Sequence, residues 1–169
     1  MLVLLVLSTL PRPDLPRLRS ARPDDAAACY AVLHASVHGG TDRFYSPAER
    51  MAWAPDPTPP EGWQDQLLAG YCCVATDHKD RIIGFMTMAE DGFLDFAYVT
   101  PDWMGRGAAA ALYDRIEDWA RAQSLSLLTT EASHLSQRFL TRRGWITTAR
   151  QSVIRHSVAL TNFRMEKPL

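Results

Sequence analysis

Three runs of apolar residues in the middle of the chain have the length and composition of buried β-strands. All three are rich in β-branched and aromatic residues, and short segments of turn-forming residues separate them. The runs are YCCVATD at 71–77, RIIGFMTMA at 81–89 and FLDFAYV at 93–99. Because connections this short join neighbouring antiparallel strands, the pattern predicts an antiparallel three-stranded meander.

A strand and a helix are predicted near the start of the chain. The segment 15–22 alternates weakly between apolar and basic residues, as an edge strand does. Pro23 and Asp24 then suit the first turn and the N-cap of a helix, whose residues follow at helical spacing until Gly39 and Gly40 end it.

A second, short helix is predicted over 46–54. Ser46, Pro47 and Glu49 form the pattern of a capping box with a proline in the first turn. The proline-rich segment 54–62 after it predicts a loop, and 63–68 predicts one further helical turn.

The part of the chain after the meander alternates between helices and strands. A long helix is predicted because apolar residues recur on one face and charged residues on the other. The apolar face holds Leu112, Ile116, Trp119 and Ala120, and the charged face holds Asp114, Arg115, Asp118 and Arg121. LSLLTTEA at 125–132 predicts a strand, 133–144 a helix that ends at Gly144, and 145–167 a final pair of strands.

The composition is that of an ordinary globular protein. Of the 169 residues, 47% are apolar and 22% charged, and we expect 15–169 to form a single domain. The first residues, MLVLLVLSTL, are too few to span a bilayer, which needs about 20 residues, and no basic residue precedes them. We therefore expect 1–14 to be an N-terminal extension, with a signal peptide as the alternative, and no association with a membrane.

Charge and cysteine usage limit the function classes. The net charge of -1 and the pI near 6.5 give no support to nucleic-acid binding, so a small-molecule or peptide partner is expected. Cys29, Cys72 and Cys73 have neither a disulfide framework nor zinc-ligand spacing. We therefore expect these cysteines to be reduced thiols in a cytoplasmic protein, and we expect no metal.

The junction VTPDWMGRGAA, at 99–109, predicts an anion-binding turn. A strand that ends at Val99 passes through Gly105, Arg106 and Gly107 into a helix, so unpaired backbone N–H groups gather at the N-terminus of that helix. The glycines allow a phosphate to approach, and the helix dipole and Arg106 attract it. Tight helix packing is the alternative interpretation. A dinucleotide-binding fingerprint does not fit, because the third glycine is missing and the turn lies past the midpoint of the chain.

The order of predicted elements, taken with this junction, resembles the GNAT superfamily of acyl-CoA N-acyltransferases from Leu15 onward. In that superfamily the turn reads Gln/Arg-x-x-Gly-x-Gly/Ala, and here 104–109 stand in those places. The segments that resemble one bacterial branch are YSPAERMAWAP at 45–55, FLDFAYVTP at 93–101, TEAS at 130–133, RFLTRRGW at 138–145 and NFRMEK at 162–167. The resemblance implies an α/β GNAT fold, with a central mixed, mostly antiparallel sheet of six to seven strands flanked by about four helices.

The resemblance also implies an acetyl-CoA-dependent N-acetyltransferase that transfers the acetyl group directly to an amine. The strand 93–99 would diverge from LSLLTTE, with pantetheine in the gap and the Ala97 N–H polarising the thioester. The expected cofactor-binding residues are Ala97, Tyr98, Val99, Met104, Gly105, Arg106, Gly107, Ala108, Ala109 and Ser133. Met104 replaces the usual Gln or Arg, which should weaken cofactor binding without abolishing it.

Two carboxylates are candidates for the general base that leaves the amine neutral. Asp95 is the first, because period-two alternation puts it on one strand face with Phe93, Ala97 and Val99. Glu131 is the second, acting directly or through water, and its other interpretation is a cap for the next helix. The tyrosine that often protonates the leaving thiolate in this superfamily is Leu140 here, so water or another residue would take that role.

The acceptor is expected to bind between the first two predicted helices and on the second. The candidate residues are His34, Phe44, Tyr45 and Trp53, which also fit plain structural roles. Nearby Asp42, Glu49 and Asp95 slightly favour a cationic acceptor, although polyamines, aminoglycoside-like compounds, amino acids and protein N-termini are all compatible. The alternative function is a non-catalytic acyl-CoA-binding or regulatory module, and the final strands permit a homodimer.

Overall fold

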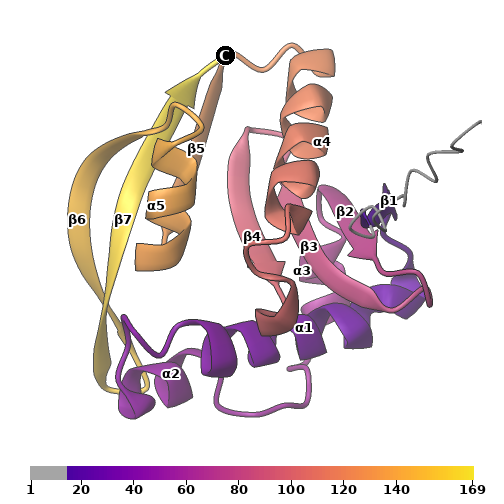
Figure 1. Cartoon of the computed structure of the whole chain (residues 1–169). Coiled ribbons are helices and arrows are strands. Elements are labelled where there is room, and N and C mark those ends of the chain that lie inside the picture. Colours follow the sequence, from indigo (N-terminus) through magenta and orange to yellow (C-terminus); the bar gives the residue numbers. More distant parts are fainter. Residues whose placement is uncertain (1–14) are drawn as a thin grey trace, which may run out of the picture.

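A seven-stranded sheet organises the chain in the computed structural model, which describes residues 15–169 (Figure 1). The strands are β1 (Arg17–Ser20), β2 (Tyr71–Thr76), β3 (Ile82–Met88), β4 (Phe93–Val99), β5 (Leu127–Ala132), β6 (Ile146–Arg155) and β7 (Val158–Pro168). Their spatial order is β1-β2-β3-β4-β5-β7-β6, and β4–β5 is the parallel pair among otherwise antiparallel neighbours. The expected mixed, mostly antiparallel sheet is confirmed, whereas the extension expected at 1–14 lies outside the described residues.

Helices cover both faces of the sheet. They are α1 (Ala26–Gly40), α2 (Pro47–Trp53), α3 (Trp63–Leu67), α4 (Ala108–Ala122) and α5 (His134–Thr141), with 3-10 turns at Pro23–Asp25 and Pro101–Trp103. One core lies between the sheet and α4 and α5, and a second lies between the sheet and α1 and α3. Cys73 and Ala75 of β2 enter the first core, and Cys72 and Val74 enter the second. Burial on both faces explains why the central strands read as continuous apolar runs.

The helix α4 packs on the sheet through small and branched residues one turn apart. Ala108, Leu112, Ile116 and Ala120 are fully buried at intervals of four residues. Residues at this spacing form one face of a helix, as the sequence pattern predicted. The N-terminal alanine is therefore held against the sheet, and the turn before it has a fixed position.

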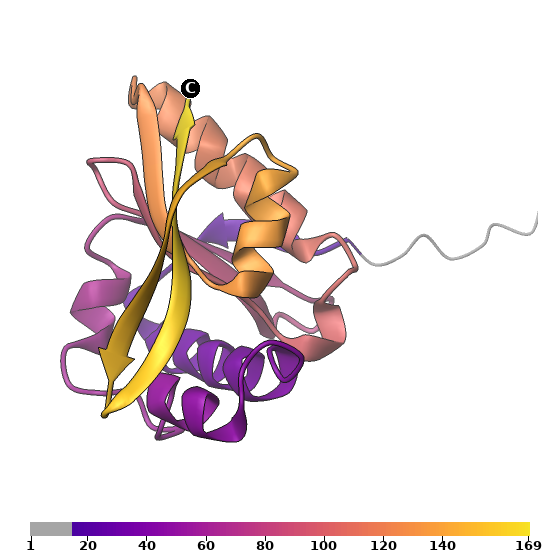
Figure 2. The same ribbon diagram turned by 90° about the vertical axis from the view of Figure 1, so that its left-hand side faces the viewer.

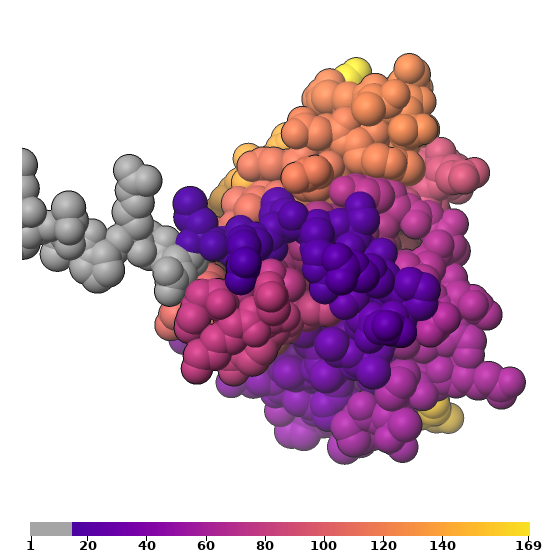
Figure 3. Space-filling model, turned by 90° about the vertical axis from the view of Figure 1, so that its right-hand side faces the viewer, coloured from indigo at the N-terminus to yellow at the C-terminus, as the bar shows by residue number. Residues whose placement is uncertain are grey.

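Side chains accept backbone N–H groups at the start of α2 and in the 3-10 turn before α1. Ser46 and Glu49 make the predicted capping box at α2, with the Glu49 carboxylate 2.7 Å from the Ser46 nitrogen. Before α1, Asp25 rather than the expected Asp24 accepts the Arg22 N–H at 2.7 Å. The reason is an ion pair, because Asp25 also accepts hydrogen bonds from both terminal nitrogens of Arg19, at 2.6 and 2.9 Å. Figure 3 shows this surface, where β1 forms one edge of the sheet.

The sheet divides into two parts between β4 and β5. These strands pair at Phe93–Thr129 and Leu94–Thr130, and the Thr130 hydroxyl donates to the Leu94 carbonyl at 2.7 Å. Beyond this point β4 follows β3, and β5 continues beside β7 (Figure 1). The two strands therefore diverge toward the end of β4, which is the end that leads into α4.

The hairpin of β6 and β7 reaches across to α2 (Figure 2). His156 and Ser157 form its turn with positive φ angles of 46° and 63°, the conformation that tight two-residue hairpins need. His156 Nδ1 lies 3.0 Å from the Ala52 carbonyl oxygen, which ties the hairpin to α2. One end of the final strands is thus brought next to residues that lie about 100 positions earlier in the chain.

Candidate active site

The turn before α4 has the geometry of an anion-binding site. Gly105 and Gly107 have φ angles of +74° and +88°, and a Cβ built on either would meet no heavy atom within 4 Å. The backbone conformation, rather than crowding by the protein, therefore requires glycine at both positions. Both residues and Arg106 between them are exposed, so the space beside them is open to a ligand.

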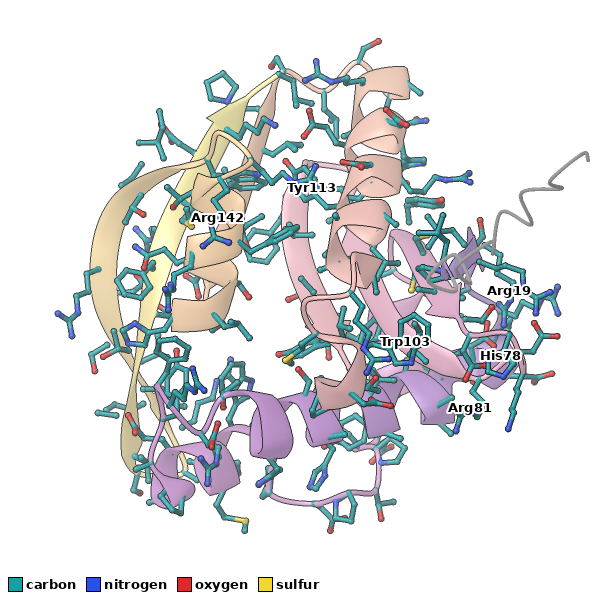
Figure 4. The ribbon with its side chains drawn as sticks, in the orientation of Figure 1. Arg19, His78, Arg81, Trp103, Tyr113 and Arg142 are labelled. Atoms are coloured by element: carbon teal, nitrogen blue, oxygen red, sulfur yellow. The ribbon has the colours of Figure 1, made fainter. Side chains whose placement is uncertain are left out.

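Backbone N–H groups at the start of α4 face this open space. The first helical bond runs from the Ala111 nitrogen to the Gly107 carbonyl at 3.0 Å. Within the described chain, the N–H groups of Ala108, Ala109 and Ala110 have no backbone acceptor, and Gly107 offers no side-chain cap. The Arg106 guanidinium adds a positive charge, 5.9 Å from the ring centre of Trp103, which Figure 4 labels in the preceding turn. Together they fit a phosphate group.

The end of α1 supports the turn by close packing. A Cβ on Gly40 would lie 2.3 Å from Met104 Cε, and one on Gly39 would lie 2.9 Å from Pro101 Cγ. Met104, which departs from the family pattern, thus fills space against a glycine of α1. From the sequence, Gly39 and Gly40 were expected only to end the helix. Their packing role was missed because it depends on a contact with residues some 60 positions away.

Backbone groups of β4 point into the divergence from β5. The Phe96 nitrogen donates to Thr87 Oγ1 at 3.0 Å, and the Thr100 nitrogen donates to the Ile83 carbonyl at 2.8 Å, so both face β3. Successive N–H groups alternate along a strand. The N–H groups of Ala97 and Val99 therefore face the diverging β5, while that of Tyr98 faces β3.

A β-bulge in β4 overturns one expectation about Asp95. Met86 pairs with Ala97 and Met88 pairs with Leu94, so β4 has one residue more than β3 over this interval. The extra residue shifts the alternation: Leu94, Ala97 and Val99 all pack on the α4 side of the sheet. Asp95 instead faces α3, where Gln66 Nε2 lies 3.5 Å from its carboxylate. The prediction that Asp95 shares a face with Ala97 and Val99 was wrong.

The two candidate bases flank the point where the strands part. Asp95 and Glu131 directly follow the last paired residues, Leu94 and Thr130. Leu128 and Ala132 enter the α4 side of the core, so Glu131 lies on the opposite face, as Asp95 does. The helix cap of α5 is made by Ser133, whose hydroxyl accepts the Ser136 N–H at 3.1 Å, and not by Glu131.

The surroundings of the two carboxylates differ. Burial raises the pKa of Asp95, against the opposing effects of the Gln66 hydrogen bond and the Arg155 guanidinium. Glu131, which is exposed as Asp95 is, accepts a hydrogen bond from Asn162 Nδ2 at 3.5 Å and lies 4.0 Å from Arg164 Nε. A carboxylate with a raised pKa is the stronger base, so Asp95 is the better placed of the two.

The position of the usual acid, Leu140, is buried in the core, with 2% of its surface exposed. The nearby Tyr113 is used elsewhere: its hydroxyl accepts hydrogen bonds from Trp145 Nε1 at 2.7 Å and from Lys167 Nζ at 3.3 Å. Figure 4 shows Tyr113 directed from α4 toward α5. Tyr113 is thus committed to packing and hydrogen bonds between α4 and α5, and Leu140 has no proton to donate.

Two of the four expected acceptor-binding residues, Tyr45 and Trp53, lie together. Tyr45 is buried, and its hydroxyl donates to the Thr161 carbonyl at 2.9 Å and accepts the His134 N–H at 3.2 Å. Trp53 lies 5.2 Å from Tyr45 and 6.4 Å from Tyr98 between ring centres, which connects α2 to β4. The hydroxyl of Tyr45 is thus committed to the fold, and the half-buried Trp53 is the residue of this pair that borders β4.

The other two expected residues each stack on a histidine. Phe44 stacks on His134 with ring centres 5.8 Å apart. His34 stays on α1, where it stacks on His38 at 4.4 Å, and burial lowers its pKa. His34 is therefore not brought into contact with the carboxylates by any interaction in the described chain.

The cysteines are chemically quiet. All three are buried, and burial raises the pKa of the Cys29 thiol to about 12 and also raises the pKa of Cys72 and Cys73. A thiol with such a pKa is protonated at neutral pH and is a poor nucleophile. Among residues 15–169, no three His, Cys, Asp or Glu side chains are grouped to hold a metal ion. The helices of this part of the chain are all too short or too polar to cross a membrane.

The residues present fit coenzyme A. The open glycine turn offers N–H donors and a positive charge to a pyrophosphate, and the free N–H groups of Ala97 and Val99 can pair with an amide-containing arm. These two sets of donors lie at the end of β4 and at the start of α4, so one extended molecule can reach both.

Comparisons with known proteins agree with this geometry. A family model described as an acetyltransferase (GNAT) domain matches residues 42–167. A solved GCN5-related N-acetyltransferase from Rhodopseudomonas palustris is 30% identical, with 94% of this chain and 98% of that chain covered and a TM-score of 0.85. A search of curated protein sequences found no match.

Two more distant structures share the fold. The yncA protein from Salmonella typhimurium, solved with acetyl-CoA, is 19% identical over 90% of this chain and 93% of that chain, with a TM-score of 0.64. The PaiA N-acetyltransferase from Thermoplasma acidophilum, solved with coenzyme A, is 16% identical over 91% of this chain and 99% of that chain, with a TM-score of 0.69.

Proposed function

The chain belongs to the family of GNAT acetyltransferase domains, and from this premise we propose that it transfers an acetyl group from acetyl-CoA to the nitrogen of an amine. The observation that carries the proposal is the pair of donor sets at the end of β4. Ala97 and Val99 direct free N–H groups toward the diverging β5, and the open turn at Gly105 and Gly107 leads into the unpaired N–H groups of α4.

The chain positions and activates the reactants without a covalent intermediate. Acetyl-CoA supplies the acetyl group as an activated thioester. The Ala97 N–H donates a hydrogen bond to the carbonyl oxygen, where negative charge develops during attack. The amine nitrogen forms a bond to the acetyl carbon, the carbon–sulfur bond breaks, and the sulfur leaves with the electron pair. The buried, protonated cysteines take no part.

Asp95 is proposed as the base that receives the ammonium proton. Glu131, which also directly follows the last β4–β5 pair, is the second candidate for this role. Both lie on the face opposite to α4, so the amine approaches from the side of α2 and α3 while the donor molecule lies toward α4. With Leu140 buried, the leaving thiolate takes its proton from water, which is acceptable because a thiolate is a stable leaving group near neutral pH.

The release of free thiol from acetyl-CoA in the presence of a panel of amines tests this function. We expect release that depends on both the protein and an amine, and an acetylated amine of the corresponding mass. The second candidate, a module that binds acyl-CoA without turnover, is favoured by the buried Leu140 at the usual acid position. It predicts binding of acetyl-CoA with no release for any amine.

A further inference from the structure

A free guanidinium borders the acceptor side of the sheet. Arg155 is the last residue of β6 and is exposed, and its guanidinium makes no hydrogen bond or ion pair within the described residues. The position of the strand end is fixed, because the adjacent His156 lies 3.0 Å from the Ala52 carbonyl, next to Trp53. An arginine whose guanidinium has no partner, at a strand end tied to α2 beside Trp53, is able to bind an anion.

The strand register puts Arg155 on the same face as Glu131. Asn162 reaches Glu131 with its amide, so both side chains share one face of the sheet. Asn162 pairs with Gln151, and the register from Gln151 to Arg155 is unbroken. Residues four positions apart on a strand point to the same side. Arg155 therefore faces the side on which the amine approaches.

The electrostatic influence of Arg155 agrees with this placement. The guanidinium lowers the pKa of both Asp95 and Tyr98, although burial raises both pKa values overall. Tyr98 in turn lies 6.4 Å from Trp53 between ring centres. Asp95, Tyr98, Trp53 and Arg155 thus form one group, drawn from β4, α2 and the end of β6.

An unsatisfied acceptor atom lies near the other carboxylate. Asn162 Oδ1 is buried and receives no hydrogen bond in the described chain, while its Nδ2 lies 3.5 Å from Glu131. A buried carbonyl oxygen without a donor is costly to the fold. Asn162 Nδ2 is directed toward Glu131, so Asn162 marks the face of the sheet on which Glu131 lies.

We propose that the acceptor is an amine that also carries an anionic group, as a free amino acid does. Arg155 binds the anionic group, and Asp95 receives the amino group. This inference rests on the proposed acetyltransferase function and names its substrate class. It also replaces the cationic acceptor favoured by the sequence, because Glu49 is committed to the N-cap of α2 and a second positive charge would face Arg155.

Matched pairs of substrates test the inference. Each standard amino acid is compared with the amine that its decarboxylation gives, at saturating acetyl-CoA, by release of free thiol. We expect kcat/KM to be roughly tenfold or more higher for the preferred amino acid than for its paired amine. In Arg155→Gln the KM for the amino acid should rise until the two kcat/KM values are equal. The kcat/KM for the paired amine should change by about twofold or less. Arg155→Lys retains part of the preference.

Arg150→Gln is the matched control, because Arg150 lies on the same strand, is exposed, and points to the opposite face with Phe163 as its partner. It should leave the preference unchanged. Equal use of both members of each pair by the natural protein, preferred use of diamines, or an equal loss for both substrates in a folded Arg155→Gln would overturn the inference. Thiol release with amines of any kind would still support the proposed function, whereas no release with any amine would overturn both.

Discussion

Asp95 owes its place to a single extra residue in β4. The bulge between Leu94 and Ala97 turns its carboxylate away from the α4 side and toward Gln66 of α3. Thr87 compensates for the broken ladder, since its hydroxyl accepts the Phe96 N–H at 3.0 Å. Bulges commonly redirect a side chain beside an active site. Here the bulge separates the group that receives the proton from the backbone that binds the thioester.

The pH dependence of activity should follow Asp95. Desolvation raises its pKa, so kcat/KM should fall as the pH decreases through a value above the ordinary pKa of an aspartate. Asp95→Asn should lower kcat by roughly a hundredfold. It should also remove the fall of kcat/KM at low pH, the acidic limb of the pH profile. If Glu131→Gln removes the limb and Asp95→Asn does not, Glu131 is the base.

The stability of the same variant separates a chemical role from a structural one. Because the folded pKa of Asp95 is raised, its contribution to stability is fully present below the unfolded pKa and is lost as the pH rises through the folded pKa. Removing the charge at neutral pH should therefore not lower the thermal denaturation midpoint. A large decrease in that midpoint would mean that the activity loss reflects misfolding.

Elements whose signals are local were predictable from the sequence. The capping box at Ser46, the end of α1 at Gly40 and the four-residue spacing in α4 each involve neighbours in the chain, and the structure confirms them. The bulge in β4 and the position of Arg155 were not predictable, because both depend on the register between strands and on a hairpin end that docks on α2. Long-range pairing has no signature within a short stretch of sequence.

The packing of α1 against the turn before α4 gives a test at the level of elements. In Gly40→Ala the new Cβ would lie 2.3 Å from Met104 Cε, so the Met104 side chain and the turn behind it must shift. We expect weaker acetyl-CoA binding, by roughly threefold to tenfold. Met104→Ala added to Gly40→Ala removes the clash and should restore most of the affinity. Calorimetric titration measures both, and equal binding by Gly40→Ala and the natural protein would show that the turn does not depend on this contact.

At the scale of the whole molecule, the site is assembled from distant parts of the chain. Trp53, Asp95 and Arg155 come from α2, β4 and β6, and the two halves of the sheet meet only at the short β4–β5 pairing. The sequence predicted the order of elements, and the family resemblance implied the divergence of these strands. The acceptor side could not be predicted in the same way, because α3 meets β4, and the β6–β7 hairpin meets α2, only in the folded chain.

The stability of the whole chain should depend on the ion pair that joins β1 to the start of α1. Arg19 and its hydrogen bonds lower the pKa of Asp25, which is 9% exposed. The stabilisation by the Asp25 carboxylate is therefore fully present above the ordinary aspartate pKa of about 3.9. It is lost as the pH falls through the lower pKa that Asp25 has in the folded chain. Asp25→Asn should lower the free energy of unfolding at neutral pH by about 2 kcal/mol, as measured by urea denaturation.

The exposed neighbour Asp24 provides the control for this variant. Asp24→Asn should change the free energy of unfolding by less than about 0.5 kcal/mol. The difference between Asp25→Asn and the natural protein should also shrink in acid, where Asp25 is protonated in both states. A constant difference across this pH range would show that the charge of Asp25 is not the source of its contribution.

Calorimetric titration with acetyl-CoA tests the central claim, that the turn before α4 and the divergence of β4 bind the acetyl donor. We expect one molecule to bind per chain, and Gly107→Val to raise the Kd by roughly tenfold or more, about 1.4 kcal/mol, because a side chain would occupy the space of the phosphate. Gly62→Val is the control, since Gly62 also has a positive φ, +77°, and open surroundings, and it should bind as the natural protein does. No binding to the folded natural protein, or unchanged binding to folded Gly107→Val, would contradict the account.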